Sequence, residues 1–153
     1  MWLLCVFLIG FVAGLRALTA PTAASWAARA GLLAVAGTPL AFMGFKYTPF
    51  IFTALAIGEL INDKLPSAGS RKAPPAFGAR IVTGALAGAT IAVGAHSLLL
   101  GLLAGAIGAI AGTLGGAAGR AKLAAMFGRD LPAALVEDLV AIAIAAFCVL
   151  RLG

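Results

Sequence analysis

The sequence predicts an all-α, multi-pass membrane protein, and three observations support this class. Of its 153 residues, 63% are hydrophobic and only 10% are charged, whereas soluble domains carry about 25% charged residues. The mean hydropathy of +1.11 is too high for a small globule to hide, because small domains expose much of their surface. Residues 81–119 contain no Asp, Glu, Lys or Arg, which is enough for two bilayer-spanning helices of roughly 20 residues each.

The N-terminal part is predicted to contain one span and shorter membrane helices. Residues 1–19 form the first span, and we do not expect a signal peptide, because no basic residue precedes the apolar core. Residues 21–45 are Ala-rich and interrupted by proline, which is typical of a short, tilted or interfacial helix. The pattern leaves open whether they cross the bilayer. Residues 49–62 form a short membrane helix that ends in an acidic cluster.

The C-terminal part is predicted to contain three spans. The charge-free run divides into helices over 81–99 and 100–119, joined by a tight turn near Gly94–Ser97. The last span covers 131–150, where Pro132 suits a helix start. With the first span, this makes four spans plus one or two short or tilted membrane helices.

The chain is expected to form a single membrane domain over 1–153, with halves 1–65 and 80–153 joined by a cytoplasmic loop at 66–79. Two sequence echoes relate the halves: "IGFVAG" resembles "IGAIAG" at 107–112, and "TALAIGEL" resembles "PAALVEDL" at 132–139. If residues 21–45 do not cross, these pairs indicate an inverted repeat, as in many transporters. Chance matches between Ala/Gly-rich segments are the alternative.

The net charge of +6 is concentrated in two loops, which carry +3 at 63–80 and +2 at 120–130. Short basic loops are retained on the cytoplasmic side, and the two spans between them return the chain to that side. The charge therefore indicates membrane topology, and we expect the lipid bilayer and no nucleic acid as a partner.

Four carboxylates are candidates for binding a proton or a cation. Glu59 and Asp63 are four residues apart and share a helix face. Glu137 and Asp138 lie within the last span, and we expect only one of them to face the interior. A central carboxylate costs about 3 kcal/mol, so such residues usually face the bundle and mark a pathway or proton relay. We interpret Lys64 as an interfacial charge.

The arginines are candidates for balancing these charges or for binding an anionic group. Arg16 ends the first span, where it either snorkels to the interface or pairs with Glu59 or an anionic ligand. Thr19 and Thr22, which flank Pro21, suit a helix start, and helix N-termini attract anions. Arg120 presents the same choice as Arg16, whereas Arg71 is interpreted as a simple cytoplasmic charge.

No metal, cofactor or catalytic residue is predicted. His96 is alone in its turn, and no Cys/His cluster has zinc-like spacing. Cys5 and Cys148 lie in apolar segments, where thiols behave as small hydrophobic groups. An enzyme is not favoured, because no nucleophile–base pair stands out.

The glycines predict close helix packing. Gly84/Gly88, Gly101/Gly105, Gly108/Gly112 and Gly115/Gly119 have the spacing that lets membrane helices approach closely. The spacing does not tell packing within one chain from packing between chains. Because so short a chain has few helices with which to enclose a polar path, we expect a homodimer, the commonest closed assembly.

Several segments resemble the bacterial domain of unknown function (DUF) 4126 family. They are "GFVAGLRALTAPTAASWAA", "GELINDKLPSAGSRKAPPAFGARIVTGALAGA" and "ALVEDLVAI". The resemblance covers almost the whole chain and implies a small multi-pass protein of the bacterial inner (cytoplasmic) membrane, without implying a substrate.

From the charged residues we expect a small transporter or permease. Its predicted substrate- or ion-binding residues are Glu59, Asp63, Glu137, Asp138, Arg16 and Arg120. The alternative is a non-transport membrane protein that recognises an anionic lipid headgroup through its basic loops.

Overall fold

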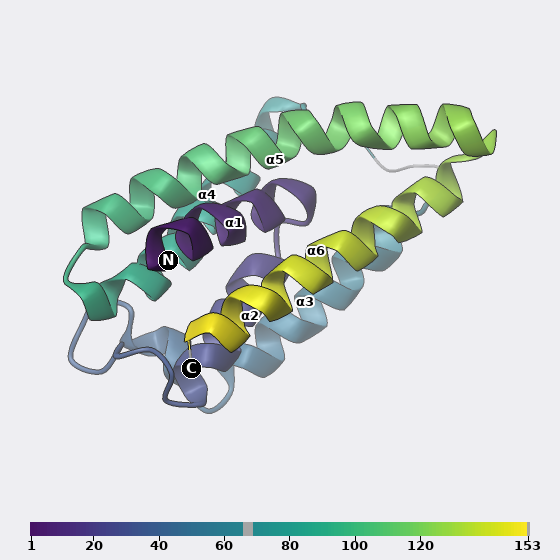
Figure 1. Ribbon diagram of the computed structural model, residues 1–153. Helices are drawn as coiled ribbons and strands as arrows, with labels where there is room; N and C mark the ends of the chain where they lie inside the picture. The colour runs from purple at the N-terminus through teal and green to yellow at the C-terminus, as the bar shows by residue number, and fades with distance from the viewer. Residues whose placement is uncertain (66–68, 153) are drawn as a thin grey trace.

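A computed structural model describes residues 1–65 and 69–152, and the regular structure within these ranges is helical throughout (Figure 1). The predicted all-α class is therefore confirmed. Residues 66–68, which open the loop expected at 66–79, lie outside the described residues. The elements are α1 (Trp2–Leu15), α2 (Thr19–Arg29), η1 (Ala41–Gly44), α3 (Thr48–Asn62), α4 (Pro74–Ala92), η2 (Val93–Ala95), α5 (Leu98–Phe127) and α6 (Asp130–Leu152).

Three helical segments are long and apolar enough to cross a membrane: Pro74–Ala95, Leu98–Phe127 and Asp130–Leu152. They correspond to the three spans predicted for the C-terminal part, and the turn expected near Gly94–Ser97 lies between α4 and α5. Two predicted loops are shorter than expected: α4 begins at Pro74, within the loop expected at 66–79, and α5 continues to Phe127, so most of the basic loop expected at 120–130 is helical. The fourth predicted span is not confirmed. Helix α1 has 14 residues, which gives about 21 Å at roughly 1.5 Å per residue, less than a typical hydrocarbon core.

The first span is short because the chain breaks at residues 16–18. Helix α2 begins at Thr19 and has Pro21 in its first turn, a position where the missing N–H of proline costs nothing. The helix start predicted around Pro21 is therefore confirmed. Within the region 21–45, only the 11-residue α2 and the short η1 are helical, so its helix is a short one, as expected.

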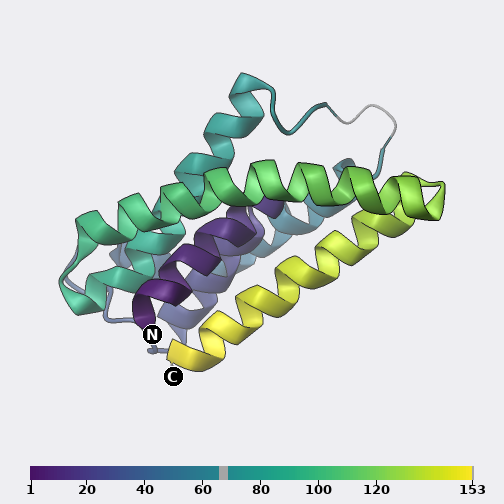
Figure 2. The ribbon, with the colours of Figure 1, turned by 45° about the horizontal axis from the view of Figure 1, so that its top comes forward.

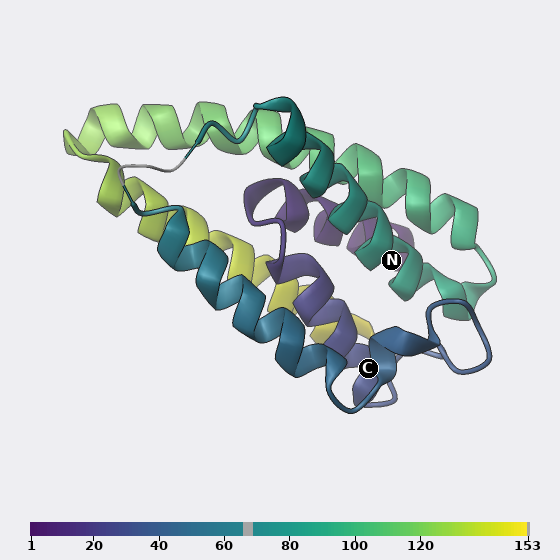
Figure 3. The same ribbon diagram turned by 180° about the vertical axis from the view of Figure 1, so that it is seen from behind.

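The helices run back and forth between two ends of the bundle. The end of α3 and the α5–α6 turn lie at one end, which we call the charged end, and the α1–α2 turn and the start of α4 point toward it from partway along α5 (Figures 1 and 3). Both chain termini and the α4–α5 turn face the opposite end (Figure 2). The basic residues of the two predicted loops therefore lie toward the same end of the bundle, as the charge distribution predicts, although Arg120 and Lys122 belong to α5.

Glycines allow α5 to pack closely against α1 and α4. A Cβ added to Gly112 would lie 2.1 Å from the Phe11 carbonyl oxygen, and one added to Gly105 would lie 2.2 Å from that of Gly84. The packing predicted for Gly84/Gly88, Gly101/Gly105 and Gly108/Gly112 thus occurs within one chain, whereas Gly115 and Gly119 have nothing within 4 Å of an added Cβ. The homodimer stays a prediction, but these glycines no longer argue for it.

The inverted repeat is not confirmed. The contacts of α1 advance along α5 in the same direction, from Gly10 beside Gly105 to Gly14 beside Gly112, so this echo pair is parallel. The second echo pair, in α3 and α6, runs antiparallel (Figures 1 and 3). One symmetry operation does not relate both pairs.

Candidate functional site

All five acidic side chains of the chain lie at the charged end, although they are spread from residue 59 to residue 138. Each of them accepts hydrogen bonds from a basic side chain or from backbone N–H groups. They are Glu59, Asp63, Asp130, Glu137 and Asp138.

Arg16 is the centre of this network and is fully buried, with 0% of its side chain exposed. Its Nε donates to Oδ1 of Asp138 at 2.5 Å, and its NH1 group donates to Oδ2 of Asp63 at 2.5 Å. Its NH2 group is 3.5 Å from Oε2 of Glu137. Arg16 therefore does not snorkel, and its ion-pair partners are other carboxylates than the Glu59 considered from sequence.

Glu59 faces the α1–α2 break and binds its backbone. Its Oε1 and Oε2 accept hydrogen bonds from the N–H groups of Ala17 at 2.7 Å and Leu18 at 2.8 Å. These N–H groups precede the first turn of α2, where helix donors lack partners and negative charge is favourable. The anion expected at this helix start is thus supplied by the protein itself.

The prediction that only one of Glu137 and Asp138 faces the interior is wrong. Both are buried, with 6% and 8% of each residue exposed. Asp138 pairs with Arg16 and Lys64, whereas both carboxylate oxygens of Glu137 bind Arg71. Neighbouring helical residues point about 100° apart, but each of these carboxylates has its own basic partners. Arg16 and Lys64 pair with Asp138, and Arg71 pairs with Glu137.

The interpretations of Lys64 and Arg71 as simple surface charges are also wrong. Lys64 pairs with Asp138 and donates to the Leu60 carbonyl oxygen at 3.0 Å. Arg71 precedes α4 in the chain, and its guanidinium reaches Glu137 of α6. Composition alone does not indicate a contact between residues so far apart in sequence.

Arg120 joins the network at its outer edge. Its Nε and NH2 groups bind both oxygens of Asp130, at 2.9 and 2.6 Å, and its NH1 group is 3.5 Å from Oε2 of Glu137. Asp130, which was not predicted, is 63% exposed. Arg120 therefore connects the buried network to solvent.

Arg80 is a buried arginine that the sequence analysis missed, and only 5% of it is exposed. Its NH1 group donates to the carbonyl oxygens of Gly14 at 2.8 Å and Leu15 at 2.9 Å, at the end of α1. Among the described residues, no carboxylate lies within ion-pairing distance of it. The sequence does contain an indication of this role: Arg80 is the charged residue of an otherwise apolar helix, and intramembrane arginines are usually functional.

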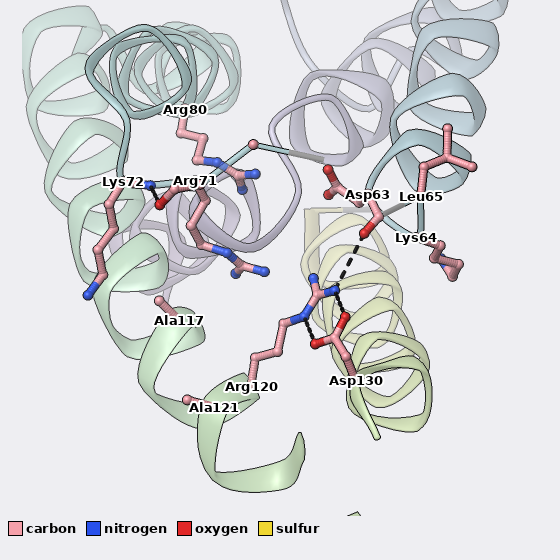
Figure 4. A pocket seen from close by; sticks show the side chains of 12 residues that line it. Asp63, Lys64, Leu65, Arg71, Lys72, Arg80, Ala117, Arg120, Ala121 and Asp130 are labelled. Carbon is pink, nitrogen blue, oxygen red and sulfur yellow. Dashed lines mark hydrogen bonds and ion pairs between the residues drawn. The ribbon is translucent and has the colours of Figure 1, made fainter. Parts of the chain in front are cut away.

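A cavity of about 640 Å³ opens beside this network (Figure 4), and of the six predicted site residues only Asp63 and Arg120 line it. Five basic and two acidic residues line it, so its charged lining carries a net positive charge. Within residues 1–65 and 69–152, no group of His, Cys, Asp and Glu is arranged to hold a metal ion. The charged lining residues are Asp63, Lys64, Arg71, Lys72, Arg80, Arg120 and Asp130.

Comparisons with known proteins add no identity: no family model, no curated protein and no solved structure matches the chain. The resemblance to the DUF4126 family therefore stays a prediction. The long apolar helices and the charged cavity fit a multi-pass membrane protein with a polar site at one end.

Proposed function

We propose that the protein is a small transporter or permease of the bacterial inner membrane, and that its substrate is a small anion bound in the charged cavity. The observation that carries this proposal is the cavity lining, in which basic side chains outnumber acidic ones by five to two. Buried charge in a bilayer-spanning bundle is costly and usually marks a pathway.

The carboxylates support anion binding better than cation binding. Asp138 is held by Arg16 and Lys64, and Glu137 is held by Arg71. A cation at either carboxylate would have to displace an existing basic partner. In this proposal the acidic side chains hold the arginines in place, and the arginines attract the substrate.

Short and interrupted helices also support transport. Helices α1 and α2 are separated by a break at the polar network, and transporters often build their sites from discontinuous helices. A second cavity of about 520 Å³ opens at the opposite end, lined by Ala34, by residues 36–39 and by residues around His96. None of its lining residues belongs to the charged cavity, so passage would require the helices between them to move.

Recognition of an anionic lipid headgroup is the second candidate. The charged cavity lies at a bundle end, where headgroups meet a membrane protein. An apolar groove of about 470 Å³ also runs between α2, α3 and α6 and has room for acyl chains. This candidate needs no path through the bundle.

Flux through reconstituted vesicles tests the proposal. Purified protein in proteoliposomes should take up radiolabelled phosphate or a small carboxylate, and Arg80→Gln should abolish uptake. Lys122→Gln is the control, because Lys122 is an exposed basic residue at the same end that does not line the cavity. Absence of anion uptake, or cation uptake that survives Arg80→Gln, would contradict the anion transporter.

A further inference from the structure

We infer that the charged cavity is a binding site for a phosphate-class oxyanion, with Arg80 as its fixed ligand. This inference rests on the proposed site but not on transport itself. A free phosphate and the phosphate of a lipid headgroup share this chemistry.

The partly paired guanidinium of Arg80 is the first argument. Its NH1 group is used by the Gly14 and Leu15 carbonyl oxygens, and these two bonds fix the direction of the side chain. Its Nε and NH2 groups make no hydrogen bond to a described residue, and because the 95% buried residue lines the cavity, these groups are reached from the cavity. A buried arginine without a carboxylate is expensive to maintain, and a bound anion would supply the missing partner.

The directions of the arginines are the second argument. Arg71, Arg80 and Arg120 come from the α3–α4 connection, α4 and α5, and their guanidinium groups point into one shared space (Figure 4). A planar carboxylate is satisfied by a single guanidinium fork. Donors that approach from several sides suit the tetrahedral arrangement of oxygens in phosphate.

Preorganisation is the third argument. Arg71 is held by Glu137 and Arg120 by Asp130, and each arginine carries five N–H donors in a rigid plane. The carboxylates therefore orient the two side chains while leaving donors for a ligand. With 11% and 15% of their side chains exposed, both interact with an anion more strongly than fully solvated groups do.

Thermal stability of the purified protein tests the inference with two probes. Inorganic phosphate is titrated in mild detergent, and phosphatidic acid is compared with phosphatidylcholine in nanodiscs, because a ligand of the folded state raises the melting temperature. We expect saturable stabilisation by at least one phosphate probe. Stabilisation by inorganic phosphate alone assigns a free solute, and stabilisation by phosphatidic acid alone assigns a lipid headgroup; both results support the site.

Variants locate the binding. Arg80→Gln should weaken phosphate binding by about tenfold to a hundredfold, as expected for loss of a charge-assisted contact, while Lys122→Gln should leave it unchanged. If Arg80→Gln does not fold, Arg80→Lys keeps the charge, loses the fork and should still weaken binding. No response of the unaltered protein to either probe, or equal weakening by Arg80→Gln and Lys122→Gln, would overturn the inference. Binding without uptake in proteoliposomes would disprove transport and leave the site intact.

Discussion

Arg80 and Glu59 cap the two helix ends on either side of one chain break. Arg80 donates to the last carbonyl groups of α1, and Glu59 accepts from the N–H groups that precede α2. Helix C-termini attract positive charge and N-termini attract negative charge, so each side chain has the appropriate sign. Between them, the backbone of Arg16 is extended, with φ of −140°, and its side chain turns into the network.

Loss of the Glu59 cap should destabilise the protein. Glu59→Ala removes both acceptors and should lower the free energy of unfolding by about 0.5–2 kcal/mol, the range measured for lost N-caps. Glu59→Gln keeps one acceptor and should cost less. Asn62→Ala is the control, because Asn62 is exposed at the end of the same helix. Denaturant unfolding in detergent measures the differences, and equal stability of Glu59→Ala and Asn62→Ala would contradict the cap.

Composition predicted the helical elements well where the signal is a long apolar run. The charge-free segment 81–119 required two helices and a turn, and α4, α5 and the turn at Val93–Ala95 are found there. The first span was predicted too long, because the apolar residues around Arg16 continue past the position where the chain breaks. The interruption depends on Glu59 and Arg80, which are distant in sequence.

The site was predicted in part. The burial cost of charge identified Arg16, Asp63, Glu137 and Asp138, and all four meet in one network. Their partners were missed because pairing is decided by tertiary packing. Lys64 and Arg71 follow a helix and lie in a connection, where most basic residues are simply solvated, so a sequence pattern does not separate these two from the rest.

Both basic loops should face the cytoplasm. After the buried Cys5 and Cys148 are replaced by Ala, single cysteines are introduced as Ser70→Cys, Lys122→Cys and His96→Cys. A membrane-impermeant maleimide should label the His96→Cys protein in intact cells and the other two only after permeabilisation, because short basic loops are retained inside. Labelling of Ser70→Cys and Lys122→Cys from opposite sides would contradict the arrangement of the helices.

Substitution by alanine should change the stability of the protein in opposite directions at two glycines of α5, Gly112 and Gly115. In Gly112→Ala the new Cβ would meet the Phe11 backbone at 2.1 Å, so α1 and α5 must separate, at a cost of about 1–3 kcal/mol typical of overpacking. Gly115 has nothing within 4 Å of an added Cβ, and Gly115→Ala should stabilise the helix by up to about 1 kcal/mol. Unfolding curves of the two variants decide the matter; similar effects of both would show that α1 and α5 are not in close contact.

Arg16 and Asp138 should be strongly coupled in stability. They are joined at 2.5 Å inside the bundle, and removing one member of a buried pair leaves the other charge uncompensated. Arg16→Gln and Asp138→Asn should therefore each lower the free energy of unfolding by about 3–5 kcal/mol.

The double variant should lose less than the sum of the single losses, with a coupling energy of about 0.5–3 kcal/mol for residues in direct contact. Arg16→Gln combined with Lys122→Gln is the matched control, because Lys122 is exposed and forms no ion pair with any described residue. That pair should be additive to within about 0.5 kcal/mol. Denaturant unfolding of the five variants in one detergent gives both cycles. Additivity of Arg16→Gln with Asp138→Asn would mean that the two side chains do not form the central ion pair, and the arginine-centred description of the charged end would then be wrong.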